Sequence, residues 1–326
     1  MKATLLLLIG LASLMGAPLE PVSAIDFGPA LHFTNAHPYL SIRYLAATSD
    51  GPTAIGGSEI AEIGIARANR GGSNVQVTRL QSSAGAIGRF AMRPDGSFWT
   101  MSQWDHPFTP VQPVLGGGDA RTPVGPPVVV GDPTAAGSFP FNNTRSATSY
   151  DLHAPDGRRL ESFRSFTAAL DIAASANEVA LVSGNLIRVG HVANGNFVND
   201  RDWRVNGPHL VFPLDHDRFA VVNRMSGEFA IIDPSTPVTR TIAVPFKSPS
   251  RRDRLPVTAA NGNIWFMVNG ASGNTRDLVQ LALDGSIVSR NTLRLAPGVQ
   301  PRKIAISGRD VYLAGTTATV YRYELP

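Results

Sequence analysis

The chain is patterned as many short runs of apolar and β-branched residues that are separated by turn residues. The clearest unit, Leu255–Leu295, contains four such runs, joined in turn by Asn261-Gly262, a loop and Asp284-Gly285. Asn-Gly and Asp-Gly dipeptides supply the positive φ angles that tight hairpins need. The unit therefore predicts four antiparallel strands, which we call A to D in chain order. Four such strands make one blade of a β-propeller.

The same pattern repeats along the chain. Few windows have the apolar spacing of an amphipathic helix, and 25 prolines and 31 glycines interrupt the sequence. Strand A is predicted to begin near residues 41, 89, 170, 209, 255 and 302, about 39 to 48 residues apart once an insertion at 104–145 is subtracted. The predicted fold is all-β, a six-bladed β-propeller of four-stranded antiparallel blades, with seven blades as the alternative.

The last predicted unit, Arg302–Tyr323, has three strands and lacks strand D. One strand-like segment near the N-terminus, Asp26–Thr34, is not assigned to any other blade. We expect it to complete the last blade, because a strand from each end of the chain would close the ring and cover two sheet edges. The alternative is a loose N-terminal tail beside an open last blade.

This order of strands and turns resembles the six-bladed β-propellers of the NHL-repeat and lactonase-like type. The resemblance covers Leu40–Pro326 and concerns the architecture. It implies a fold that is shared by lactonases, lyases, dehydrogenases and binding scaffolds, so it does not by itself choose a function.

The N-terminal residues have the pattern of a secretory signal peptide. Lys2 precedes an apolar run, Leu5–Ala12, and Val22-Ser23-Ala24 has the small residues of a cleavage site. We expect a signal peptide over 1–24, a single domain over 25–326, and a periplasmic or secreted protein. A retained membrane anchor is the alternative, although the apolar run is too short to span a bilayer. The chain has no cysteine, so its stability must come from a buried core.

The basic residues are almost all arginine. Only Lys2, Lys247 and Lys303 are lysine, so 26 of the 29 basic residues are arginine, and the isoelectric point is about 9.7. The arginines are dispersed instead of clustered on one element, which argues against nucleic-acid binding. We expect a monomer without a membrane span that binds a small anionic ligand or a protein.

Propellers usually carry their site on the face where strands A begin. The residues predicted to enter strand A are Arg43, Arg89, Asp171, His209, Arg254 and Arg302. Those predicted to follow strand B are Gln103, Asn185, Asn223, Arg224, Asn269 and Thr316. Five of the six entrances carry an arginine or histidine, which predicts a positive ring that suits carboxylate or phosphate groups. The alternative is that the arginine stems simply cover the rim.

The insertion at 104–145 is predicted to lie on this same face, in the B-to-C loop of the second blade. It is rich in proline and glycine but contains Trp104, Phe108, Phe139 and Phe141. Long loops in compact domains are often functional. We consider a lid or partner-binding loop, which includes Trp104, a passive surface loop, and a degenerate seventh blade around Val128–Val130.

Signatures of a particular chemistry are scarce. The sequence has no G-x-S-x-G elbow, phosphate-binding loop or cysteine nucleophile. His209 and Asp171 are the candidate catalytic residues of a hydrolase or lyase, while His216 belongs to a polar turn. No metal site and no cofactor are expected. Calcium is the one alternative, held by Asp171, Asn223 and Asn269. That set partly resembles the calcium-dependent lactonases, but Arg43 stands where they place a carboxylate. The leading hypothesis is a binding module.

Overall fold

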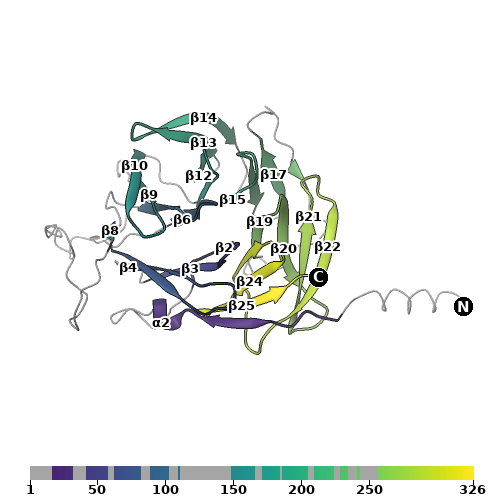
Figure 1. The fold of residues 1–326 in the computed structure, drawn as a ribbon. Helices are drawn as coiled ribbons and strands as arrows, with labels where there is room; N and C mark the ends of the chain where they lie inside the picture. The colour runs from purple at the N-terminus through teal and green to yellow at the C-terminus, as the bar shows by residue number, and fades with distance from the viewer. Residues whose placement is uncertain are drawn as a thin grey trace, which may run out of the picture.

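We describe a computed structural model of the chain. It describes residues 17–31, 42–57, 62–81, 89–102, 109–110, 148–165, 171–183, 186–204, 209–223, 228–233, 241–242 and 256–326. These residues form six antiparallel sheets that follow one another around a ring (Figure 1). No helix in the described ranges is long and apolar enough to cross a membrane.

The strands match the predicted blades closely. The first blade contains β2 (Tyr44–Thr48), β3 (Gly51–Gly57), β4 (Glu62–Arg67) and β5 (Gln76–Gln81), with β8 (Thr109–Pro110) added at its outer edge. The second contains β6 (Arg89–Met92), β7 (Phe98–Ser102), β9 (Thr148–His153) and β10 (Arg159–Ser165). The third contains β11 (Asp171–Ala174), β12 (Val179–Ser183), β13 (Leu186–Ala193) and β14 (Asn196–Arg204). The fourth blade contains β15 (His209–Pro213), β16 (Phe219–Asn223), β17 (Phe229–Ile232) and β18 (Thr241–Ile242). The fifth contains β19 (Val257–Ala260), β20 (Asn263–Asn269), β21 (Thr275–Leu281) and β22 (Ile287–Arg294). The sixth contains β23 (Lys303–Ser307), β24 (Asp310–Ala314), β25 (Thr319–Glu324) and β1 (Ser23–Asp26).

The hairpin turns explain why the predicted strand boundaries were accurate. In the Asn261-Gly262 turn both residues have positive φ, 53° and 70°, as a tight two-residue hairpin requires. In the Asp284-Gly285 turn Gly285 has a positive φ and Asp284 does not. There the Asp284 carboxylate accepts the backbone N–H of Ser286 at 2.9 Å. The two dipeptides therefore end strands by different local geometries.

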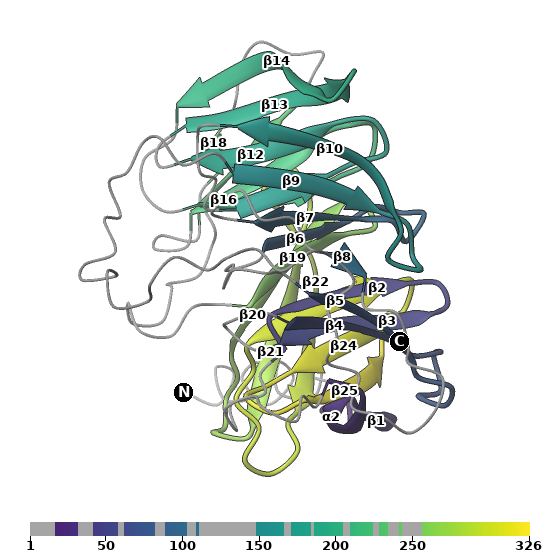
Figure 2. The same cartoon turned by 90° about the vertical axis from the view of Figure 1, so that its left-hand side faces the viewer.

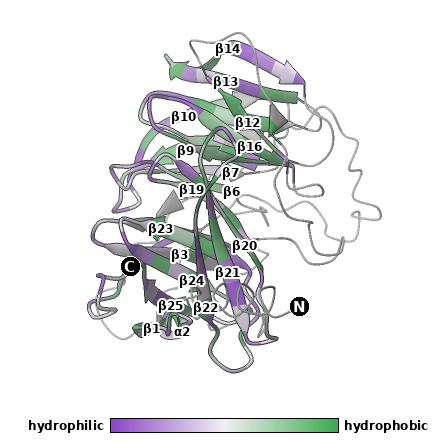
Figure 3. Ribbon diagram, turned by 90° about the vertical axis from the view of Figure 1, so that its right-hand side faces the viewer, coloured by the Kyte–Doolittle hydropathy of each residue, from purple (hydrophilic) through white to green (hydrophobic). Residues whose placement is uncertain are grey.

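Each pair of neighbouring blades shares a buried apolar cluster. Ile172 of β11 lies in a cluster with Trp99 of the second blade, whereas the next residue, Ala173, lies in a cluster with Val221 of the fourth. Successive residues of a strand point to opposite faces, so one strand supplies two clusters. Six such clusters join the six blades into a ring. Accordingly β12, β16 and β20 are largely hydrophobic, while the outer strand β14 is largely hydrophilic (Figure 3).

An N-terminal strand closes the last blade, as predicted, but it lies earlier in the chain than expected. Strand β1 pairs antiparallel with β25, with Ser23 opposite Arg322 and Asp26 opposite Thr319. The predicted segment Asp26–Thr34 instead begins where the strand ends, and helix α2 (Gly28–Leu31) follows. The Asp26 carboxylate accepts the Gly28 N–H at 2.8 Å, and Pro29 fits a first helical turn because it has no N–H to pair. Residues 32–34 lie outside the described ranges.

The insertion connects strands B and C of the second blade, as predicted. It leaves β7 and returns at β9. Between them β8 pairs with β5 of the first blade, with Leu80 opposite Pro110 and Gln81 opposite Thr109 (Figure 2). The connection thus reaches the outer edge of a neighbouring blade. The predicted degenerate blade at Val128–Val130 lies outside the described residues.

Candidate functional site

The candidate site lies at the end of the ring where the innermost strands begin. Arg43 is half-buried and its backbone N–H donates to the Ile55 carbonyl at 2.7 Å. Arg302 is exposed and its N–H donates to the Ala314 carbonyl at 2.9 Å. Both residues therefore stand at the entrance of a strand A, on the first and sixth blades. The structure describes only the backbone of Arg89 and His209.

The residues that follow strand B lie at the same end. Asn223 is half-buried, and its N–H donates to the Glu228 carbonyl at 2.8 Å. Asn269 and Thr316 are exposed, on the fifth and sixth blades. The remaining predicted site residues lie outside the described ranges: Gln103, Trp104, Asn185, Arg224 and Arg254.

Three predicted residues come together at the junction of the third and fourth blades. His209 and Asn223 lie directly opposite each other in the β15–β16 pair. Asp171 begins β11, and its carboxylate accepts the backbone N–H of Val211 at 3.0 Å. Val211 lies in β15, two residues after His209, so this hydrogen bond joins β11 and β15, the innermost strands of the third and fourth blades. Asn269 belongs to the fifth blade, so the predicted calcium set is divided between blades.

Tyr44 is a polar residue of this region that the sequence reading did not single out. Its hydroxyl accepts the backbone N–H of Met92 at 3.1 Å, and its ring centroid is 6.5 Å from that of Phe90. Burial raises the pKa of Tyr44, the Met92 hydrogen bond lowers it, and the charge of Asp171 raises it further. The Tyr44 hydroxyl therefore joins the first two blades, and the charge of Asp171 in the third blade acts on it. The only sequence feature that could have indicated this role is a tyrosine in an innermost strand.

The opposite end of the ring consists of turns that are linked to one another. Arg93 donates to the Ser175 carbonyl at 3.2 Å, and Asn177 donates to the Asp217 carboxylate at 2.8 Å. These contacts join the A-to-B turns of the second, third and fourth blades. His216 lies in the turn between β15 and β16, which the hydrogen bond from the Leu214 N–H to the Arg218 carbonyl closes, and its φ is 54°. This confirms the predicted polar turn.

Several arginines also bridge blades away from the candidate site. Arg67 donates to the Pro155 carbonyl at 2.7 Å, from the first blade to the second. Arg201 of the third blade donates to the Asp233 carbonyl, in the fourth, at 3.2 Å. These arginines therefore help to hold neighbouring blades together. The ligand-binding ring of entrance arginines stays a prediction.

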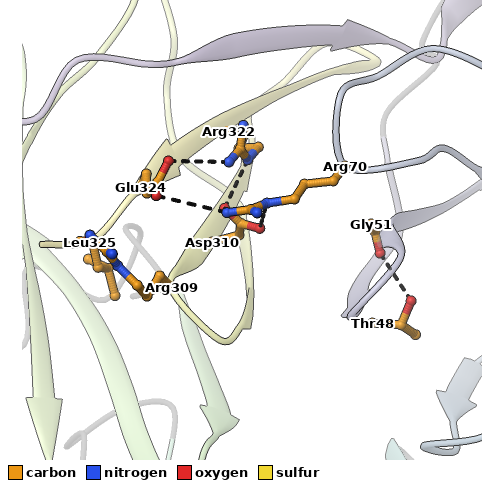
Figure 4. Close-up of polar contacts among 8 residues, drawn as sticks. All are labelled: Thr48, Gly51, Arg70, Arg309, Asp310, Arg322, Glu324 and Leu325. Carbon is orange, nitrogen blue, oxygen red and sulfur yellow. Dashed lines mark hydrogen bonds and ion pairs between the residues drawn. The ribbon is translucent and has the colours of Figure 1, made fainter.

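The seam between the first and sixth blades holds a network of charged side chains (Figure 4). Arg70, in the loop after β4, contacts Asp310 at 2.5 Å, and Arg322 contacts the same carboxylate at 2.9 Å. Arg322 also lies 3.4 Å from Glu324. Burial raises the pKa of Asp310, but the hydrogen bonds from Arg70 and Arg322 outweigh it and the pKa lies below its usual value. This network secures the place where the ring closes.

Within the described ranges, no three histidine, aspartate, glutamate or cysteine side chains converge in a way that could hold a metal ion. The described residues at this end combine exposed side chains, those of Asn269, Arg302 and Thr316, with the half-buried side chains of Arg43, Asp171 and Asn223. Such a surface can donate and accept hydrogen bonds to a ligand or a partner. Calcium at this end of the ring stays a prediction of the sequence.

Comparisons with known proteins find similar folds among solved structures. No protein-family model matches the chain, and no curated protein matches it. Among solved structures, virginiamycin B lyase from Staphylococcus aureus is 11% identical and covers 93% of this chain and 99% of its own, with a TM-score of 0.50. BamB from Moraxella catarrhalis is 12% identical and covers 95% and 98%, with a TM-score of 0.47. At such identities the likeness concerns the fold alone. The chain is a six-bladed β-propeller.

Proposed function

We propose that the protein is an exported binding module, periplasmic or secreted, that engages a protein partner through the face carrying the insertion. The observation that carries this proposal is the path of the insertion. The insertion leaves and returns on the second blade, and its residues Thr109–Pro110 pair with β5, the outer strand of the first blade. The points where the insertion leaves β7 and returns to β9 and the Thr109–Pro110 pairing lie at one end of the ring, and functional residues concentrate on loops held by a rigid scaffold.

Three further observations support binding over chemistry. The described residues at this end include exposed polar groups, such as Asn269 and Thr316. Asp171, the candidate catalytic carboxylate, accepts a backbone hydrogen bond from the neighbouring blade. The insertion also brings Trp104, Phe108, Phe139 and Phe141, and aromatic residues are enriched at protein interfaces.

Site-specific photo-crosslinking in the native host tests the proposal. A photoreactive amino acid is introduced at Asn269 or Thr316, on the proposed face, and at His216, which is 84% exposed at the opposite end, as the matched control. We expect a discrete protein adduct from the first two positions and none from His216. Adducts of equal yield from both ends, or no adduct from any position, would contradict the proposal.

A hydrolase or lyase is the second candidate, favoured by the pairing of His209 with Asn223 beside Asp171. His209 would serve as the base, and the arginines would stabilise an anionic intermediate. Thermal unfolding with phosphate, citrate or calcium chloride tests this site. A ligand at 100 times its dissociation constant adds about 2.7 kcal/mol of stability. This second candidate predicts an upward shift that His209→Gln abolishes and His216→Gln retains; no shift with any of the three would contradict it.

A further inference from the structure

The residues ahead of β1 are built into the ring. Leu19 forms a parallel bridge with Leu293 of β22, the outer strand of the fifth blade. Its N–H donates to the Thr292 carbonyl at 2.8 Å, and its carbonyl accepts the Arg294 N–H at 2.9 Å. The Leu19 side chain packs on the apolar cluster between the fifth and sixth blades. Leu19 therefore covers part of a sheet edge that would otherwise be open.

The next residues carry the chain from the fifth blade to the sixth. The Glu20 carboxylate lies 3.0 Å from the Arg294 guanidinium. The Val22 N–H donates to the Arg322 carbonyl at 2.7 Å, and Ser23 and Ala24 then supply half of the four residues of β1. In Figure 1 the chain passes β22 before it reaches β1. One continuous stretch, Leu19–Ala24, thus joins two blades.

We propose that the export signal is removed ahead of Leu19, so that Leu19–Ala24 remain in the mature protein. This inference rests on the proposed export. A cut after Ala24, which the Val22-Ser23-Ala24 motif predicts, would remove the contacts of Leu19 and Glu20 with β22 and half of the closing strand. Gly16 follows the apolar run and supplies a small residue at the cut, with Leu14, an aliphatic residue as Val22 is in the other motif, two positions before it.

The mature N-terminus can be read directly. The full chain is expressed in a bacterium, and the exported fraction is analysed by intact mass and N-terminal sequencing. We expect a first residue at or before Leu19 but after the apolar run. A first residue at Ile25 would overturn this inference while leaving export intact. An unprocessed chain that stays in the cytoplasm would overturn the inference and the proposed export together.

Two matched variants place the cut independently of the fold. Ala17 and Ala24 are both exposed, so a charged side chain at either position is compatible with the structure. Ala24→Glu is expected to be processed as the wild type is, whereas the double variant Gly16→Glu, Ala17→Glu is expected to accumulate as the precursor. Precursor accumulation with Ala24→Glu alone would overturn the inference.

A third measurement tests the structural reason. Chains that start at Ala17 and at Ile25 are produced without a leader, and their melting temperatures are compared. The shorter chain loses the backbone hydrogen bonds of Leu19 and Val22, so we expect it to melt lower by about 5 °C or more. Equal melting temperatures would show that Leu19–Ala24 are dispensable and would overturn the inference.

Discussion

Replacing Phe27 with alanine is expected to lower the free energy of unfolding by about 3 to 5 kcal/mol, although Phe27 belongs to no strand. The residue lies between β1 and α2, and its side chain is fully buried in the cluster that joins the sixth and first blades. Tyr312 of the sixth blade and Leu45 of the first share this cluster. Truncation would leave a cavity at the seam of the ring, where two blades from opposite ends of the chain meet.

Urea unfolding followed by circular dichroism measures this effect. Val22→Ala is the matched control, because Val22 is in the same N-terminal segment but 56% exposed. The control is expected to change stability by no more than about 0.5 kcal/mol. If Phe27→Ala fell within 1 kcal/mol of the control, roughly the scale of a surface change, the N-terminal segment would not hold the ring closed.

The blades could be predicted from the sequence because propeller strands are short and bounded by turn residues. The apolar run that follows the predicted Asn261-Gly262 turn is β20, Asn263–Asn269, and the turn has the expected backbone. The exact closing strand could not be predicted. In Ser23–Asp26 only Ile25 is buried, so four residues offer too little alternation to recognise. The same residues also match a cleavage motif, which drew the strand assignment to a later segment.

The candidate site was less predictable because contacts between blades have no fixed spacing in sequence. Asp171 was placed at a strand entrance, where the structure has it, but the hydrogen bond to Val211 joins residues 40 positions apart. Tyr44 and Met92 are 48 positions apart. A one-dimensional pattern shows which residues enter a strand and does not show which neighbouring blade each side chain reaches.

Removing the carboxylate of Asp310 is expected to destabilise the protein by up to about 3 to 5 kcal/mol, because it would leave the nearly buried Arg322 with only the more exposed Glu324, 3.4 Å away, as a counter-charge. The side chains of Asp310 and Arg322 are only 9% and 11% exposed, and their contact is 2.9 Å. The test variant is Asp310→Ala, measured by urea unfolding at pH 7. Arg70→Ala is the matched control. Arg70 is 51% exposed, so the loss of its contact with Asp310 is expected to destabilise the protein far less than Asp310→Ala does.

The effect of Asp310 should also depend on pH in a defined direction. Its pKa in the folded protein lies below the ordinary value of 3.8, because the hydrogen bonds from Arg70 and Arg322 outweigh burial. A group with a lowered folded pKa stabilises the protein above its unfolded pKa, and this contribution is lost as pH falls through the folded pKa. The stability difference between the wild type and Asp310→Asn should therefore be full at pH 7 and shrink steadily below about pH 4. Taking the difference cancels the titration of carboxylates that both proteins share. A gap that stayed constant from pH 7 to pH 3 would mean that the Asp310 carboxylate is not held ionised at the seam.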